Sequence, residues 1–139
     1  MGKIRHNIMG LSIPGCIAWY YWRQIPNHHP NVVLDTFIVM PNHIHGIIGI
    51  QALDYGLKPE GTCHGMSLPH RAKFGKPQAE SLSIILNQYK GAVTKWCHLH
   101  HHDYFKWQSR FYDEIIRNEK ALDNIRNYIL YNPENWRKD

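Results

Sequence analysis

Cysteine is scarce in this chain of 139 residues, and long apolar runs are absent. The three cysteines, Cys16, Cys63 and Cys97, form no CxxC pair, which argues against a disulfide framework or a zinc knuckle. No apolar run approaches the length of a membrane span, and the first residues lack the apolar segment of a secretory signal. We therefore expect a soluble protein of the reducing cytoplasm that has no membrane partner.

Acidic residues are also in deficit. Lys and Arg number 16 against 11 Asp and Glu, so the formal net charge is +5 without any contribution from histidine. This balance favours a polyanionic partner, and nucleic acid is the first candidate. A hydrophobic content of 43% suffices for one core, so we expect a single domain over residues 1–139.

The hydrophobic pattern predicts an α+β chain in the order strand, helix, strand, strand, helix, strand, helix. Stretches rich in β-branched and aromatic residues predict strands at 3–9, 31–40, 43–50 and 105–112. Apolar residues three and four apart predict three helices. The first runs from 13 to 25 and is ended by Pro26, and the second runs from Glu80 past Trp96 with Ser81 as its cap. The third begins at Asn118 or Asp123 and is ended by Pro133. Residues 51–77 hold many glycines and prolines, which predicts a flexible exposed loop insertion.

Two histidines stand two residues apart in the string Met40-Pro41-Asn42-His43-Ile44-His45. Residues i and i+2 of a strand project from the same face, so the imidazoles of His43 and His45 can share one metal ion. A lone pair of this kind is more often a structural or surface feature than a metal site. The spacing alone is therefore only weakly specific.

The last predicted helix carries a tyrosine and a carboxamide four residues apart, Tyr128 and Asn132, which places both on one face. On a helical wheel they flank the apolar stripe formed by Leu122, Ile125 and Ile129, whereas Tyr131 falls nearly opposite. Geometry thus favours Tyr128 over Tyr131 as a functional phenol. Taken singly, Tyr128 also fits the edge of a core, and Asn132 fits the end of a helix before a proline.

The remaining tyrosines and a histidine tract offer other interpretations. Tyr89 lies in the apolar stripe of the second predicted helix and is expected in the core, while Tyr104 and Tyr112 border a predicted strand and stay open as alternatives. His98, His100, His101 and His102 form a local cluster, for which solvation or adventitious metal capture is a better interpretation than a built site.

A metal ion and a phenol together can break a phosphodiester. A phenol has an ordinary pKa of about 10, so it needs assistance to attack phosphorus at neutral pH. A divalent ion, Mg²⁺ or Mn²⁺, held by two imidazoles, a carboxamide oxygen and waters would polarise the phosphate and orient the scissile bond. Attack by tyrosine retains the ester as a phosphotyrosine link that a DNA hydroxyl can later reverse.

Several segments in matching order resemble the REP-associated tyrosine transposases, a family of the single-tyrosine HUH transposase superfamily. The likeness covers essentially residues 31–136 apart from the loop, and it is carried by Val39-Met40-Pro41-Asn42-His43-Ile44-His45, by Ile85 to Trp96, by Trp107-Gln108-Ser109-Arg110-Phe111-Tyr112-Asp113-Glu114-Ile115-Ile116-Arg117, and by Arg126-Asn127-Tyr128-Ile129-Leu130-Tyr131-Asn132-Pro133.

The resemblance implies a ferredoxin-like α+β domain with an antiparallel sheet and cleavage of single-stranded DNA by one tyrosine. The motif histidines match His43 and His45, the nucleophile matches Tyr128, and the amide ligand one turn later matches Asn132. Single-stranded or hairpin DNA as substrate and a homodimer as assembly are further implications.

In one respect the chain departs from the family. Family members usually begin with a tyrosine-rich strand that lies centrally in the sheet, and here the chain starts close to the first predicted helix. A sheet without its central strand exposes an unpaired edge. Strand exchange within a dimer, or residues 3–9, would fill that edge.

The leading hypothesis is a metal-dependent single-stranded DNA endonuclease and strand transferase of transposase type. Two alternatives stay open: an inactive, N-terminally shortened remnant that binds nucleic acid, and a hydrolytic nuclease in which the metal activates water. A charge argument alone nominates four basic side chains for DNA binding: Lys90, Lys95, Arg110 and Arg117.

Overall fold

The computed structural model describes residues 1–6, 8–51, 81–109 and 111–136, so most of the predicted loop, Cys63 and Arg110 lie outside the described residues. The α+β class is confirmed. The helices and strands among the described residues are β1 (Gly2–Arg5), β2 (Ile8–Leu11), α1 (Ile13–His28), β3 (Val32–Val39), β4 (Ile44–Ile50), α2 (Leu82–Leu99) and α3 (Glu119–Asn135).

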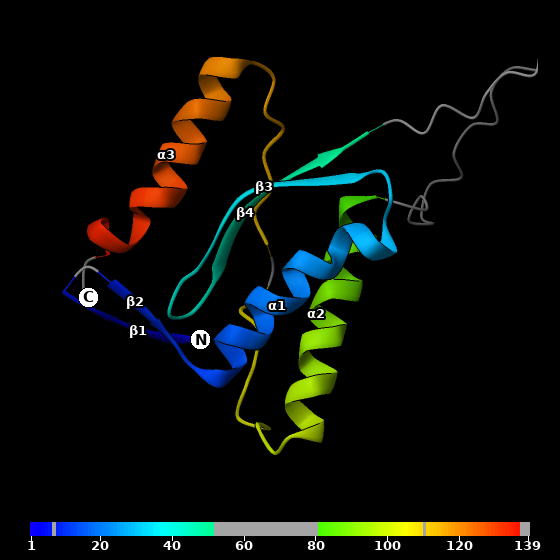
Figure 1. Ribbon diagram of the computed structural model, residues 1–139, viewed down its shortest axis with the longest axis vertical. Helices are drawn as coiled ribbons and strands as arrows, with labels where there is room; N and C mark the ends of the chain where they lie inside the picture. The colour runs from blue at the N-terminus through cyan, green and yellow to red at the C-terminus, as the bar shows by residue number, and fades with distance from the viewer. Residues whose placement is uncertain (7, 52–80, 110, 137–139) are drawn as a thin grey trace, which may run out of the picture.

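β3 and β4 form an antiparallel ribbon that confirms the two strands predicted in the middle of the chain. The register runs from Val32 opposite Ile50 to Val39 opposite Ile44 and is interrupted between Leu34 and Phe37. The amide N–H of Met40 donates to the carbonyl of His43 at 2.8 Å and closes the turn. Figure 1 shows α3 on one side of this ribbon and α1 with α2 on the other.

The two faces of the ribbon pack on different helices because neighbouring residues of a strand project in opposite directions. Gly46 faces α1, where a Cβ atom in its place would lie 2.5 Å from the indole of Trp22. Trp22 in turn stacks on Phe37, with ring centroids 4.2 Å apart. His45, the preceding residue, faces α3 and contacts Tyr128 there.

The main core lies between α1, α2 and β3. The buried side chains of its cluster are Ala18, Trp22, Ile25, Val32, Ile85, Tyr89, Val93, Cys97 and Phe105. Tyr89 is a core residue, as predicted, and its buried hydroxyl donates to the carbonyl of Ala18 at 3.0 Å. Cys16 is exposed and Cys97 is buried, and both are free thiols.

The N-terminal residues form two strands where the sequence predicts one. β1 pairs with β2 from Gly2 opposite Leu11 to Arg5 opposite Ile8, and His6 has a φ of 49°, in the left-handed region that tight hairpin turns use. In the described part of the chain this hairpin and the β3–β4 ribbon are separate sheets. The expectation that residues 3–9 fill an edge of the main sheet is therefore wrong.

Two prolines predicted to end helices lie inside them. α1 continues past Pro26 because the N–H of His29 reaches the carbonyl of Ile25 at 2.9 Å and completes the last turn. Pro133 likewise lies within α3, two residues before its end. At the start of α3, Asn118 is the N-cap, and its side-chain oxygen accepts from the N–H of Ala121 at 2.8 Å.

The strand predicted at 105–112 is wrong, because the described residues of this segment form no strand. A strand needs a neighbouring backbone, and the aromatic side chains here pack on α2 instead. The indole N–H of Trp107 points to the carbonyl of Lys90 and the hydroxyl of Thr94, each at 3.2 Å. Across the described ranges, no helix combines the length and apolar character that crossing a membrane requires.

Gly46→Ala tests the close approach of the ribbon to α1. We expect it to lower the free energy of unfolding by about 1–3 kcal/mol, because the new methyl group must displace the Trp22 ring in a packed core. Chemical denaturation measures this change.

Gly91→Ala, in the middle of α2, is the matched control, since a Cβ atom there meets nothing within 4 Å. It should stabilise the protein by about 0.5–1 kcal/mol. Equal effects of the two substitutions would contradict the packing described.

Candidate functional site

His43 and His45 meet at the start of β4, as their spacing predicts. Their Nε2 atoms lie 2.9 Å apart, and the two rings are nearly perpendicular with centroids 4.6 Å apart. Both side chains are half-buried. The pair therefore presents two nitrogen atoms to one point in space.

The neighbours of each ring indicate which nitrogen can carry a proton. Asn42 Oδ1 lies 2.6 Å from Nδ1 of His43, so that nitrogen donates its proton and Nε2 keeps its lone pair. Asn132 Nδ2 lies 3.4 Å from Nε2 of His45 and can donate to it. With the proton of His43 on Nδ1, its Nε2 can accept a hydrogen bond from Nε2–H of His45, and when neither Nε2 carries a proton the pair can bind one cation.

Burial favours the neutral form of both imidazoles. Partial burial lowers the pKa of His43 and of His45, and the neighbouring charge of His43 lowers the pKa of His45 further. Neutral imidazole is the form that binds a metal ion.

α3 supplies the other two predicted residues of the site. Asn132 is only 8% exposed and lies against His45, whereas Tyr128, one turn earlier, is 58% exposed. The ring of Tyr128 lies edge-on to that of His45, with centroids 5.5 Å apart. The phenol thus lies beside the histidine pair and is open to a large substrate.

An ion pair joins α3 to the ribbon. Arg126 Nε lies 3.1 Å from both carboxylate oxygens of Asp35 on β3, and its Nη2 lies 2.5 Å from Oδ2. Arg126 also pairs with Asp123 within α3 at 3.1 Å. The guanidinium therefore fixes the face of α3 that carries Tyr128 and Asn132 against the strand next to β4.

Two neighbours of His43 were not among the predicted site residues. Trp136 follows α3, and its ring lies 5.8 Å from that of His43, centroid to centroid. It stands four residues after Asn132, so helical spacing could have indicated it. Asn42, which orients His43, directly precedes it in the sequence.

The nominated basic residues are not gathered at the histidine pair. Lys95 is exposed on α2, across the ribbon from α3, and the ammonium of Lys90 lies 5.7 Å from the ring centroids of both Trp107 and Phe111. Arg117 lies two residues before Glu119, the first residue of α3, and Tyr128 lies about 13 Å further along the helix axis from Glu119. Arg110 lies outside the described residues.

The other tyrosines and the histidine tract lie elsewhere. Tyr104 contacts His102, with its hydroxyl 3.2 Å from Nδ1. His100 stacks on Trp96 at 3.9 Å and points its Nδ1 to that residue's carbonyl. Within the described ranges, no three His, Cys, Asp or Glu side chains come together as metal ligands.

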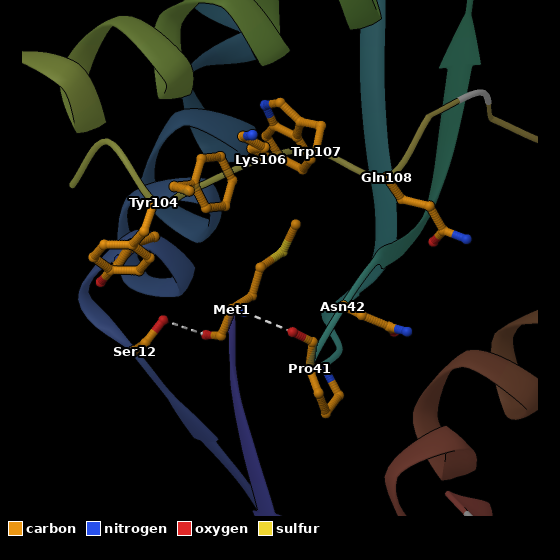
Figure 2. Close-up of a pocket in the computed structure, with 10 residues that line it drawn as sticks. Met1, Ser12, Pro41, Asn42, Tyr104, Lys106, Trp107 and Gln108 are labelled. Carbon is orange, nitrogen blue, oxygen red and sulfur yellow. Dashed lines mark hydrogen bonds between the residues drawn. The ribbon is translucent and has the colours of Figure 1, made fainter. Parts of the chain in front are cut away.

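A cavity of about 470 Å³ adjoins the turn before His43. Figure 2 shows Met1 between Ser12 and Pro41 in its wall, with Tyr104 and Trp107 across from them. The Met1 amine donates to the carbonyl of Pro41 at 2.6 Å. The Ser12 hydroxyl donates to the carbonyl of Met1 at 2.7 Å. These bonds hold the turn that carries Asn42 and His43.

Comparison with known proteins shows one family relationship. The chain is 34% identical over 140 residues to an uncharacterized protein of Haemophilus influenzae (strain ATCC 51907 / DSM 11121 / KW20 / Rd), and the alignment covers 99% of this chain and 74% of that protein. The chain belongs to the same family as that protein. No family model and no solved structure matches the chain.

Asp35→Asn tests the ion pair through its pH dependence. The hydrogen bonds from Arg126, together with those from Thr36, lower the pKa of Asp35 from 3.8 to about 2. A lowered pKa in the folded state stabilises the protein above the unfolded pKa of about 4, and this stabilisation is lost as the pH falls towards 2. In urea titrations, the wild type should be more stable than the variant at neutral pH, and the difference should shrink between pH 4 and pH 2.

Asp123→Asn is the matched control. Asp123 pairs with the same guanidinium but is 65% exposed and lies on the same helix, so its loss should cost less. A stability difference between wild type and Asp35→Asn that is constant from pH 7 to pH 2 would contradict the assigned pairing.

Proposed function

We propose that this protein is a metal-dependent endonuclease and strand transferase for single-stranded DNA, of the REP-associated tyrosine transposase type. The observation that carries the proposal is the approach of two histidines from the middle of the chain to a phenol and a carboxamide of the last helix. His43, His45, Tyr128 and Asn132 are the residues that the family resemblance nominates.

The histidine pair fits a divalent ion. Two nitrogens that share an octahedral ion at about 2.1 Å stand about 3 Å apart when they are adjacent ligands. The Nε2 atoms of His43 and His45 are 2.9 Å apart. Rotation of the Asn132 amide by a half turn would bring its oxygen to the side now taken by Nδ2, as the third ligand.

Mg²⁺ or Mn²⁺ at this position would polarise a nonbridging phosphate oxygen and neutralise charge that develops on it. The protein's own residues then position the reacting groups. Asn42 holds the imidazole of His43, and the Arg126–Asp35 ion pair holds α3, which would place Tyr128 beside a phosphate at the ion.

The chemical step is an in-line displacement at phosphorus. The phenolic oxygen of Tyr128 forms a bond to phosphorus as the bond to the departing sugar oxygen breaks. The phenol gives its proton to solvent and the departing oxygen takes one up. A DNA hydroxyl that attacks the phosphotyrosine reverses the same step, so cleavage and rejoining need no ATP.

The fold supports the same proposal at a finer level. We assign the β3–β4 ribbon with α1, α2 and α3 to a ferredoxin-like HUH domain, since the ribbon has helices on both faces and the HxH pair at the start of one strand. Hairpin DNA as substrate, a homodimer as assembly and a cytoplasmic location belong to this proposal as implications of the resemblance and composition.

Tyr128→Phe tests the nucleophile. Wild type incubated with labelled single-stranded hairpin DNA and Mn²⁺ should give a complex that survives denaturation, and the variant should give none, because it lacks the attacking oxygen. Tyr131→Phe, three residues along the same helix, is the control and should retain the complex. A covalent complex that persists in Tyr128→Phe would move the role to another tyrosine, and cleavage without any adduct would indicate attack by water.

Metal binding is expected to depend on the histidine pair. The double variant His43→Ala/His45→Ala should weaken Mn²⁺ binding, followed by electron paramagnetic resonance, by about 10-fold or more, since two nitrogen ligands are lost. His100→Ala/His102→Ala is the matched control and removes two histidines from the other tract. Loss of the strongest Mn²⁺ site in the control, and not in the first variant, would contradict the proposed centre.

A further inference from the structure

A second cleft opens on the N-terminal side of the histidine pair. It has a volume of about 280 Å³ and is lined by β1 together with Pro41 and Trp136. Pro41 lines this cleft and also the larger cavity of Figure 2. In Figure 1 the end of α3 lies beside the β1–β2 hairpin. The residues that line the cleft come from β1, from the turn at Pro41 and from Trp136, which follows α3.

The walls of the cleft combine positive charge with an aromatic surface. Lys3 and Arg5 are both exposed and stand two apart on β1, so they project from one face of the strand. Trp136 forms the facing wall, half-buried, with its indole tilted against His43. Cationic side chains with an aromatic platform are the combination that binds single-stranded nucleic acid.

We infer that this cleft binds the single strand of DNA next to the scissile phosphate. Lys3 and Arg5 contact backbone phosphates, and a base stacks on Trp136. The inference rests on the proposed function for its substrate, and it adds three residues that neither the motif nor the family likeness nominates. Because Trp136 contacts His43, a strand held here leads directly to the metal-binding pair.

Position also favours the cleft over the basic residues nominated from the sequence. Lys90 and Lys95 lie on α2, across the ribbon from α3, and the ammonium of Lys90 already faces two aromatic rings. Lys3 and Arg5 belong instead to the hairpin on the side of Trp136. They are therefore better placed to neutralise phosphates close to Tyr128.

Lys3→Ala/Arg5→Ala tests the phosphate contacts. All binding is measured in the Tyr128→Phe background without metal, by fluorescence anisotropy of fluorescein-labelled oligothymidine. The plot of log Kobs against log salt concentration should lose about 0.7 in slope per phosphate contact, or about 1.4 for the two residues. Arg23→Ala/Lys120→Ala removes the same charges from exposed positions of α1 and α3 and should leave the slope unchanged.

Trp136→Ala tests the stacking contact. It should weaken binding of oligothymidine by about 5-fold or more and leave binding of an abasic strand of equal length unchanged, because an abasic strand has nothing to stack. Trp19→Ala, which removes a 43% exposed indole on α1, is the control and should change neither. Thermal melts of every variant verify that it is folded.

The outcomes of these experiments test the cleft and the proposed function separately. Equal salt slopes in the two double variants, or an equal loss of abasic and thymidine binding in Trp136→Ala, overturn the cleft even if wild type forms its covalent adduct. Cleft-dependent binding without any adduct in wild type upholds the cleft and overturns the tyrosine chemistry. Failure of the Tyr128→Phe parent to bind single-stranded DNA, together with absence of an adduct in wild type, overturns both.

Discussion

The ion pair between Arg126 and Asp35 connects the last helix to the ribbon, and the residues of the candidate site are divided between these two elements. His43 and His45 belong to the ribbon, whereas Tyr128 and Asn132 belong to α3. The pair is formed by a forked guanidinium on one carboxylate, which fixes direction as well as distance. Its two side chains are 37% and 29% exposed, so it is screened only in part and holds a helix whose own buried surface is small.

One face of the ribbon packs on the main core, and the other face carries the residues of the candidate site. On one face Gly46 permits the indole of Trp22 to approach the backbone, and the large core follows from that contact. On the other face His45 meets Asn132 and Tyr128, which are polar or exposed. Because adjacent residues carry these two roles, a shift of one residue in the register of β4 would turn the imidazole of His45 towards α1 and Gly46 towards α3.

The sequence predicted those elements that depend on the propensity and spacing of residues close together in the chain. The ribbon strands, the three helices and the Asn118 cap were predictable from propensity and periodicity, and so were the pairs that share one face of a strand or a helix. The hairpin turn at His6 escaped prediction because no glycine marks it. The strand at 105–112 failed because pairing depends on a distant backbone, and the Asp35–Arg126 contact spans 91 residues without any local signal.

The proposed chemistry follows from the 2.9 Å contact between Nε2 of His43 and Nε2 of His45, because two imidazole nitrogens this close can bind one cation when neither carries a proton. A crystal structure of the protein grown with Mn²⁺ and recorded with anomalous scattering tests this most directly. We expect one strong anomalous peak within about 2.3 Å of Nε2 of both His43 and His45, with the Asn132 amide turned to present its oxygen and Tyr128 alongside. An anomalous peak at the tract His98–His102, with none between His43 and His45, would contradict it.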